Sequence, residues 1–240
     1  MSSPARRPRT PDEELLELPS TRTTDATRVA RMASELAGGF STLEELGPAV
    51  AVFGSARTPP GSPEYELARE LGRRLGAAGF AVITGGGGGA MEAANHGARD
   101  AGARSVGLTI DLPFEEMDNS FLDTPLNFHY FFTRKVMFVR YAQAFVVLPG
   151  GFGTLDELFE LLTLLQTHKI RHAPVCLVRS DYWQPVIGWL RDTVAAEGKI
   201  SAGDLDLLRM CDDLDDVVAG VRASAAEGPS RLKGSAPGVE

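Results

Sequence analysis

The chain has 240 residues, a hydrophobic fraction of 43% and a formal net charge of −8. This length suits one large α/β domain with a full core, and the acidic balance lacks the basic surface that binds a nucleic-acid backbone. Two cysteines, Cys176 and Cys211, are too few for a disulfide framework and indicate a reducing compartment, so the cytoplasm is the expected location. No apolar run approaches the roughly 20 residues that cross a bilayer.

Both ends of the chain differ in composition from its middle. Residues 1–24 carry charge and proline but no apolar stretch of the kind found in a secretory signal, and residues 224–240 have a similar character. We expect both to be mobile tails. Residues 25–223 are the expected nucleotide-binding α/β domain, with a helical extension over residues 25–46.

Within that domain, short β-like runs alternate with helical ones, as in a parallel sheet covered by helices on both faces. Most of the expected strands are continuous apolar runs, which is typical when both faces are buried. The strands are expected at 49–54, 80–84, 105–110, 126–131, 144–148 and 175–178. The helices are expected at 62–79, 89–102, 133–143, 155–169 and 183–198. The predicted fold is a single Rossmann-like doubly wound domain with a mostly parallel sheet.

The first notable loop, TGGGGGAME at residues 84–92, follows a strand and opens a helix. Glycine lets backbone N–H groups approach a ligand, and a helix N-terminus favours an anion. Gly85, Gly87 and Ala90 fit G-x-G-x-x-A, and Asp111 ends the next strand, where a dinucleotide enzyme holds the ribose. An NAD-dependent oxidoreductase is therefore one alternative, although five glycines fit this template almost automatically. A flexible linker is the other.

Further along, the helix in FFTRKVMFVRYA carries two cations near its start. With Thr133 as the expected N-cap, Arg134 and Lys135 lie in the first turn, where each cation costs about 0.3–1 kcal/mol against the macrodipole. Either an ordinary salt bridge or an anionic ligand would compensate them. Met137 lies one turn after Arg134 on the same face and would form an apolar wall.

The last loop, PGGFGTLDE at residues 149–157, combines glycines with a hydroxyl group and two carboxylates at a helix start. Gly150, Gly151 and Gly153 can expose backbone donors, and Thr154 can add its hydroxyl group. Because no lysine follows the glycines, the loop is not a P-loop, which argues against a nucleoside triphosphate hydrolase.

The carboxylates after this loop also have structural interpretations. Thr154 and Glu157 fit a T-x-x-E capping box, which needs no function. Asp156 is expected to complement the helix dipole, and Glu160 to lie on a solvated face. A functional interpretation follows from the fold, because ligands of doubly wound sheets bind outside the carboxyl ends of the strands. The two helix starts could then share a pocket that binds an anion and offers an acid to a developing positive charge.

At these residues the sequence resembles the LOG ("Lonely guy") family, the cytokinin-activating phosphoribohydrolases long labelled lysine decarboxylases. The family signature is a PGGxGTxxE loop preceded by an Arg-Lys pair, and the resemblance covers roughly residues 49–172. It implies hydrolysis of the N-glycosidic bond of adenine-type nucleoside 5′-monophosphates, either cytokinin riboside 5′-monophosphate or AMP, to free base and ribose 5-phosphate. It also implies a homodimer or a larger homo-oligomer, and no metal or cofactor.

The resemblance implies that Arg134 and Glu157 are the catalytic pair. Glu115 is expected to contact the substrate, with the neighbouring Glu116 leaving the register open. Together with Met137, the expected substrate-binding residues are Gly54, Ser55, Gly86, Gly87, Glu115, Lys135, Gly150, Gly151, Phe152, Gly153, Thr154, Leu155, Asp156 and Thr163.

General chemistry is consistent with these roles. Cleavage of a ribosyl–base bond passes through an oxocarbenium-like state, which a carboxylate can stabilise while it orients the attacking water. We expect Glu157 to do this and Arg134 to hold Glu157 ionised and contact the substrate. Lysine decarboxylation would need a pyridoxal phosphate lysine, and only Lys135 lies near the glycine loops. A non-catalytic nucleotide-binding or sensing module remains an alternative, and the preferred base stays open.

Overall fold

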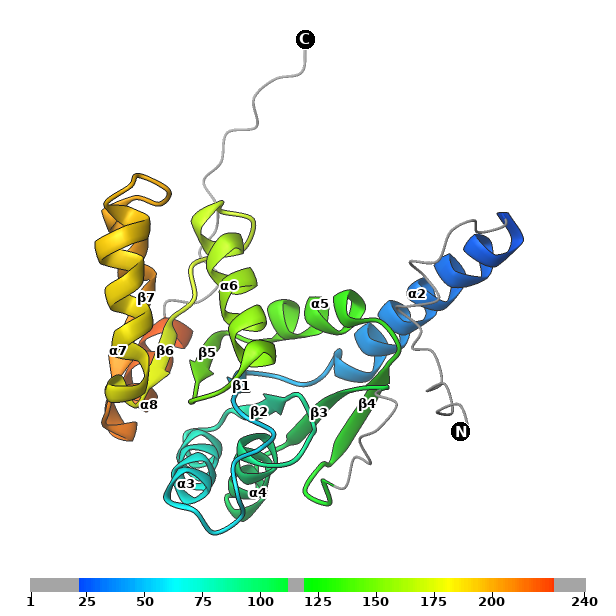
Figure 1. Cartoon of the computed structure of the whole chain (residues 1–240). Coiled ribbons are helices and arrows are strands. Elements are labelled where there is room, and N and C mark those ends of the chain that lie inside the picture. The colour runs from blue at the N-terminus through cyan, green and yellow to red at the C-terminus, as the bar shows by residue number, and fades with distance from the viewer. Residues whose placement is uncertain (1–21, 112–118, 227–240) are drawn as a thin grey trace, which may run out of the picture.

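The computed structural model describes residues 22–111 and 119–226, with side chains from residue 25 onward. Within these residues, seven parallel strands form one sheet in the order β4-β3-β2-β1-β5-β6-β7 (Figure 1). The strands are β1 (Ala49–Phe53), β2 (Ala81–Thr84), β3 (Ser105–Ile110), β4 (Thr124–Phe128), β5 (Ala144–Val147), β6 (Val175–Val178) and β7 (Leu208–Cys211). The chain builds outward from β1 to β4 and then returns to place β5 on the other side of β1.

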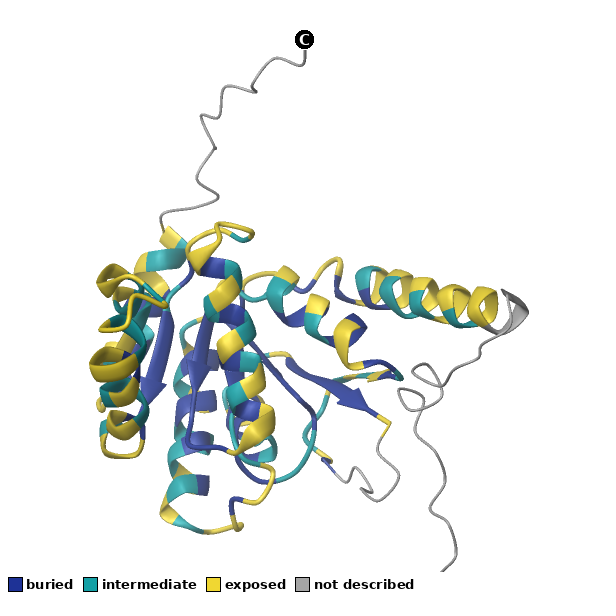
Figure 2. Ribbon diagram, turned by 45° about the horizontal axis from the view of Figure 1, so that its top comes forward, coloured by how far each residue is buried: buried dark blue, intermediate teal, exposed yellow. Residues whose placement is uncertain are grey.

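Helices cover both faces of this sheet, so its five inner strands are wholly buried, whereas the edge strands β4 and β7 are partly exposed (Figure 2). One face packs against α2 (Arg22–Leu43), α5 (Phe131–Tyr141), α6 (Phe152–Gln166) and α7 (Ser180–Trp189). The opposite face packs against α3 (Pro63–Ala77), α4 (Ala90–Asp100) and α8 (Leu214–Ala226). A π-helical segment (Leu190–Ala195) continues α7, and a 3₁₀ helix (Ala202–Leu207) precedes β7. The predicted doubly wound α/β fold is confirmed.

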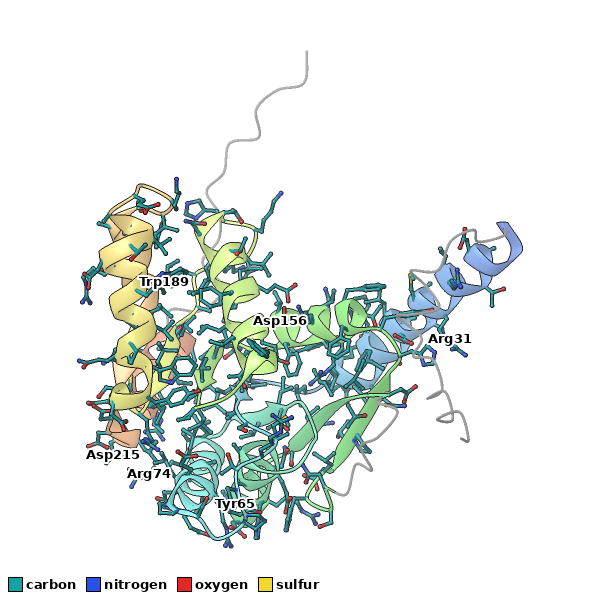
Figure 3. All side chains as sticks on the ribbon, viewed as in Figure 1. Arg31, Tyr65, Arg74, Asp156, Trp189 and Asp215 are labelled. Carbon is teal, nitrogen blue, oxygen red and sulfur yellow. The ribbon has the colours of Figure 1, made fainter. Side chains whose placement is uncertain are left out.

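Local sequence signals explain several helix boundaries. Ser62 caps α3 by accepting a hydrogen bond from the Tyr65 backbone N–H, and Pro63 takes the first helical position, as predicted. The acidic residues Asp215 and Asp216 lie in the first turn of α8, where they complement the dipole. Arg74 of α3 pairs with Asp215 across the surface between the two helices (Figure 3).

The helical extension packs along α5 and runs in the same direction. Thr133 Oγ1 donates to Glu35 Oε2 over 2.6 Å, and Tyr141 O–H donates to the Phe40 carbonyl over 3.2 Å. The N-terminal half of α2 reaches past the sheet in both views (Figures 1 and 2). Because α2 begins at Arg22 and α8 ends at Ala226, the helical segments run slightly beyond the expected limits of residues 25 and 223.

Three details differ from the sequence-based expectations. The strand expected at 126–131 runs from Thr124 to Phe128, and β7 was not expected at all. β7 has an intermediate-exposed-intermediate-buried pattern because it lies at the edge of the sheet, so it lacks the continuous apolar run of the inner strands. Helices α5 and α6 start two and three residues earlier than expected.

Two parts of the sequence prediction concern residues outside the described ranges. Glu115 and Glu116 lie outside them, as do most of both expected tails. Among the described residues, no helix is both long enough and apolar enough to span a bilayer.

Candidate active site

The candidate site lies where the sheet order reverses, at the carboxyl ends of β1 and β5. Such a switch point is the usual ligand crevice of an open α/β sheet. The Ser55 N–H donates to the Pro149 carbonyl over 3.2 Å, and the Ser55 carbonyl accepts from the Ala90 N–H over 2.9 Å. The loops after β1, β2 and β5 are therefore joined, and they contain Gly54, Ser55 and the two glycine loops.

Arg134 enters this region from α5 and is almost fully buried, with 7% of its surface exposed. Its Nε donates to the Leu108 carbonyl of β3 over 2.7 Å. An ideal Cβ on Gly85 would lie only 2.4 Å from Arg134 Nη2, so the guanidinium occupies space that only glycine leaves free. Burial lowers the pKa of Arg134 and the charge of Glu157 opposes that, but arginine stays protonated in proteins.

Glu157 approaches from α6, with its Oε1 3.7 Å from Arg134 Nη2. Burial raises the pKa of Glu157 to about 7, because the charge of Arg134 only partly offsets the loss of solvent and the charge of Asp156 adds to the rise. Arg134 thus favours the ionised form of Glu157, as expected, but its charge does not fully offset the effect of burial. Near neutral pH this carboxyl group exists in both protonation states, which suits a group that exchanges protons.

Lys135, the next residue of α5, contacts two other carboxylates of α6. Its Nζ lies 2.8 Å from Asp156 Oδ2 and 2.9 Å from Glu160 Oε2, and Figure 3 labels Asp156 where α6 meets α5. Burial lowers the pKa of Lys135, but the hydrogen bonds to both acids outweigh it and raise the pKa above its usual value. The ordinary salt bridge considered for Lys135 is present. Asp156 and Glu160 serve this pair, which corrects their expected roles as dipole partner and solvated residue.

The predicted capping of α5 was also wrong, since the N-cap is Tyr130. The Tyr130 carbonyl accepts from the Arg134 N–H and from Thr133 Oγ1. Thr133 thus lies inside the helix, where its hydroxyl group bonds backward as threonine commonly does. Arg134 and Lys135 are consequently beyond the first three positions, and their cost against the helix dipole is smaller than the sequence suggested.

The PGGFGT loop leads into α6 without any side-chain cap. The N-cap is Gly151, no side chain bonds to the cap position, and no acidic residue lies in the first turn. The expected capping box of Thr154 and Glu157 is therefore absent, because both residues lie within the helix. The Thr154 side chain packs on Gly150, where an ideal Cβ would be 2.1 Å from Thr154 Oγ1. The first-turn N–H groups keep the capacity to bind an anion.

The other glycine loop is packed more tightly. Gly86 and Gly89 have positive φ angles of 73° and 64°, and an ideal Cβ on Gly89 would lie 2.5 Å from the Ser55 carbonyl oxygen. The first turn of α4 already holds Glu92, whose Oε1 accepts from Tyr65 O–H over 3.0 Å. The Glu92 carboxylate therefore offsets the positive end of the α4 dipole, whereas the first turn of α6 has no such carboxylate. The start of α4 is therefore a poor phosphate site, and the dinucleotide interpretation of the loop would require one there.

A buried polar network fixes this loop, and the sequence analysis missed it. Asn95 Nδ2 donates to Ser105 Oγ over 2.8 Å, and Asn95 Oδ1 accepts from Thr84 Oγ1 over 2.6 Å. Thr84 Oγ1 accepts from the Gly86 N–H, and Asn119 Nδ2 donates to the Gly87 carbonyl. No local pattern reveals such a network, because its members come from four different segments.

Two expected substrate contacts do not face Arg134. Met137 is fully buried in the core, and an ideal Cβ on Gly39 of α2 would lie 2.7 Å from its sulfur. Met137 is therefore a packing residue between α5 and α2, which corrects its expected role as a pocket wall. Thr163 lies on the outer side of α6 and lines a hollow of about 480 Å³ with Lys135, Phe152, Leu155, Asp156, Phe159 and Glu160.

Two further observations bear on alternatives. Asp111 accepts from Asn127 Nδ2 over 2.5 Å, and its Oδ2 lies 2.7 Å from His129 Nδ1. The acid of the dinucleotide alternative is thus already engaged. Across residues 22–111 and 119–226, no three histidine, cysteine or acidic side chains gather as a metal site would require.

Comparison with known proteins identifies the family. The family model described as "Possible lysine decarboxylase" matches residues 91–221, more than half of the chain. The chain belongs to this family. Its membership confirms the LOG resemblance, because several relatives carry the corresponding enzyme name.

Two bacterial relatives of the LOG family are named cytokinin riboside 5′-monophosphate phosphoribohydrolase. The protein from Mycobacterium tuberculosis is 32% identical over 176 residues, which cover 70% of this chain and 90% of the relative. The protein from Rhodococcoides fascians is 28% identical over 187 residues, which cover 72% and 89%. Among solved structures, TM1055 matches with a TM-score of 0.55 at 25% identity, covering 73% of this chain and 99% of that one. The similarity to this solved structure is consistent with the α/β fold described above.

Proposed function

We propose that this chain hydrolyses the N-glycosidic bond of adenine-type nucleoside 5′-monophosphates and releases free base and ribose 5-phosphate. The names of the two bacterial relatives support this activity. The observation that carries the proposal is the buried Glu157 carboxyl group 3.7 Å from Arg134, beside a helix start with no acid in its first turn. This arrangement suits a substrate that has a phosphate at one end and develops positive charge on its sugar.

In the proposed reaction, the bond between C1′ and the base nitrogen breaks, and its electron pair leaves with the base. A water molecule adds its oxygen to C1′. Ionised Glu157 accepts one proton from that water, and the proton then passes to the departing base. A pKa near 7 allows Glu157 to accept and release this proton with little energetic cost at neutral pH.

Arg134 acts in this scheme as a permanent cation. Because its Nε is bonded to the Leu108 carbonyl, the terminal nitrogens remain to contact the substrate and the Glu157 carboxylate. It transfers no proton, since its pKa exceeds about 12 in ordinary surroundings. Its role is to hold the sugar of the substrate and the Glu157 carboxylate in the correct relative position.

The first turn of α6 is the proposed 5′-phosphate site. Its members are Gly150, Gly151, Phe152, Gly153 and Thr154, with Gly54 and Ser55 across the switch point. Gly86 and Gly87 adjoin Gly85 beneath the guanidinium of Arg134. Contacts of Lys135, Leu155, Asp156, Thr163 and Glu115 with a nucleotide stay predictions.

Lysine decarboxylation, which the name of the family model suggests, is less well supported. A Schiff base requires a neutral amine, whereas the Lys135 ammonium group lies between Asp156 and Glu160. The sensing-module alternative has no specific observation in its favour, because binding alone would not require a buried acid beside Arg134.

We also propose a homodimer in the cytoplasm. Large apolar side chains are exposed on neighbouring helices, namely Phe131, Phe132 and Val136 of α5 and Phe152 and Phe159 of α6. Phe152 has 92% of its surface exposed, which is unusual for a phenylalanine that meets only water. A second copy of the chain would cover this surface. Two buried cysteines with free thiols suit a reducing compartment.

The deciding experiment measures release of free base from AMP and from isopentenyladenosine 5′-monophosphate by wild type and Glu157→Gln. We expect wild type to release base and the variant to lose at least about 100-fold in kcat. The ratio of the two wild-type rates then assigns the preferred base. If wild type releases no base but AMP raises its melting temperature, the sensing module replaces the enzyme.

A further inference from the structure

Tyr182 of α7 contacts the PGGFGT loop. Its O–H donates to the Gly150 carbonyl over 2.8 Å. The two residues are 32 positions apart, and Figure 1 shows α6 lying between α7 and α5. A side chain of α7 thus bonds to the backbone of the loop, and neither the capping pattern nor the family signature predicted this contact.

The start of α7 is itself held firmly. The Ser180 N–H and Oγ donate to the two oxygens of Asp212 over 2.7 and 2.6 Å. Arg179 has a left-handed φ of 73° and forms ion pairs with Glu64 and Asp181. The Tyr182 ring packs edge-on against the fully buried Trp183. Although Tyr182 is 43% exposed, these contacts of its helix and its ring hold the hydroxyl group in place as a donor.

The bond to the Gly150 carbonyl fixes one peptide plane. In a trans peptide the C=O and N–H groups point in opposite directions. Because Tyr182 holds the Gly150 oxygen toward α7, the N–H of Gly151, in the same peptide, must point away from α7. Gly151 is the N-cap of α6, so this N–H lies at the N-terminus of the helix.

Little else restrains this peptide on the Gly151 side. An ideal Cβ on Gly151 would meet nothing within 4 Å, whereas Gly150 is packed against Thr154. A peptide between two glycines can rotate at low cost, since neither residue has a Cβ to limit φ and ψ. The Tyr182 hydroxyl group supplies the restraint that the side chains do not.

We propose that Tyr182 is a positioning residue that orients the Gly151 N–H toward the 5′-phosphate of the substrate. The proposal rests on the proposed function for the identity of the ligand. The phenol acts as a neutral hydrogen-bond donor throughout, and no proton leaves it. Its effect reaches the substrate through the backbone, by keeping the donors of the first turn of α6 directed at one anion.

The test compares Tyr182→Phe with Tyr141→Phe as the matched control. Tyr141 O–H also donates to a backbone carbonyl, that of Phe40, but at the far end of α5. The dissociation constant of ribose 5-phosphate is measured by calorimetry, and kcat and KM are measured with AMP. For Tyr182→Phe we expect about tenfold weaker ribose 5-phosphate binding and about tenfold higher KM, with kcat within about twofold. Tyr141→Phe should match wild type in both.

The outcomes separate this inference from the proposed function. If Tyr182→Phe binds ribose 5-phosphate as tightly as wild type while AMP is hydrolysed, the inference is overturned and the function stands. If wild type releases no base but binds ribose 5-phosphate about tenfold more tightly than Tyr182→Phe, the inference stands and the hydrolase does not. If wild type binds neither ribose 5-phosphate nor AMP, both are overturned. A melting temperature close to that of wild type shows that the phenylalanine variant is folded.

Discussion

Arg134 Nη2 lies 3.7 Å from Glu157 Oε1, and both side chains are shielded from water. This distance is too long for a hydrogen bond but close enough for a strong electrostatic effect. Arg134 favours the charged form of Glu157, but burial outweighs this attraction and raises the pKa of the carboxyl group to about 7. Several measurable consequences follow from this geometry.

The activity should depend on pH through Glu157. Because the reaction as proposed needs the ionised carboxylate, kcat/KM should rise about tenfold per pH unit below pH 7 and level off above it. The 5′-phosphate of the substrate also titrates near pH 6. The carboxyl group should therefore be followed directly by nuclear magnetic resonance of the free protein. A midpoint near 4.5 would contradict the burial argument.

The same pKa shift predicts a stability effect of known sign. The folded protein holds the Glu157 proton more tightly than the unfolded chain, since burial raises the pKa from 4.5 to about 7. The contribution of Glu157 to the free energy of unfolding should be fully present below pH 4.5 and decrease as pH rises to 7. Denaturant titrations of wild type and Glu157→Gln across this range should show the decrease in wild type alone.

The neighbouring charges should move the Glu157 midpoint in opposite directions. The Asp156 charge raises the pKa of Glu157 and the Lys135 charge lowers it. Asp156→Asn should therefore shift the pH–rate profile to lower pH, and Lys135→Ala should shift it to higher pH. Both variants should lose at most about 1 kcal/mol of stability, because these ion pairs are partly exposed. Shifts of the same sign in both variants would contradict the electrostatic origin.

Gly85 should be required for the position of Arg134. In Gly85→Ala, the new Cβ would meet the guanidinium at 2.4 Å, and the bond from Arg134 Nε to Leu108 limits how far it can withdraw. We expect kcat to fall at least about 100-fold, since a displacement of about 1 Å at a catalytic group has that effect. Base release and the melting temperature are both measured.

Gly88→Ala is the matched control within the same loop. An ideal Cβ on Gly88 meets nothing closer than 3.8 Å, and its φ is not positive. This variant should keep activity within about twofold of wild type, because no neighbouring atom has to move. Equal losses in both variants would show that the loop tolerates no alanine, and the argument about Arg134 would fail.

The proposed dimer should depend on the apolar surface of α5 and α6. Replacing Phe132 and Phe159 by aspartate puts charges on that surface and should convert the protein to monomers in light scattering after gel filtration. Trp189→Asp serves as the control, since Trp189 is also exposed, at 55%, but belongs to α7 and not to α5 or α6. A wild-type protein that is already monomeric at micromolar concentration would contradict the proposal.

The sequence by itself determined the parts of this protein that depend on local chemistry. Continuous apolar runs gave the inner strands, because a parallel strand with two covered faces leaves no alternating pattern. Ser62 and Pro63 marked the start of α3, since cap and first-turn preferences act over a few residues. The PGGFGT loop and the Arg-Lys pair were sufficient to indicate the family that the comparisons confirmed.

Only the tertiary structure decided how those residues are used. The capping box of Thr154 and Glu157 is plausible locally. Arg134, however, lies 26 positions along the chain from Leu108, and no local rule places it beside Leu108 and Gly85, because the sheet order brings these segments together. Burial then raised the pKa of Glu157 against the attraction of Arg134. Met137 lies on the side of α5 that faces the core. Lys135 lies elsewhere on the same helix and pairs with Asp156 and Glu160. Desolvation and packing depend on neighbours from distant segments, so no local pattern could have supplied them.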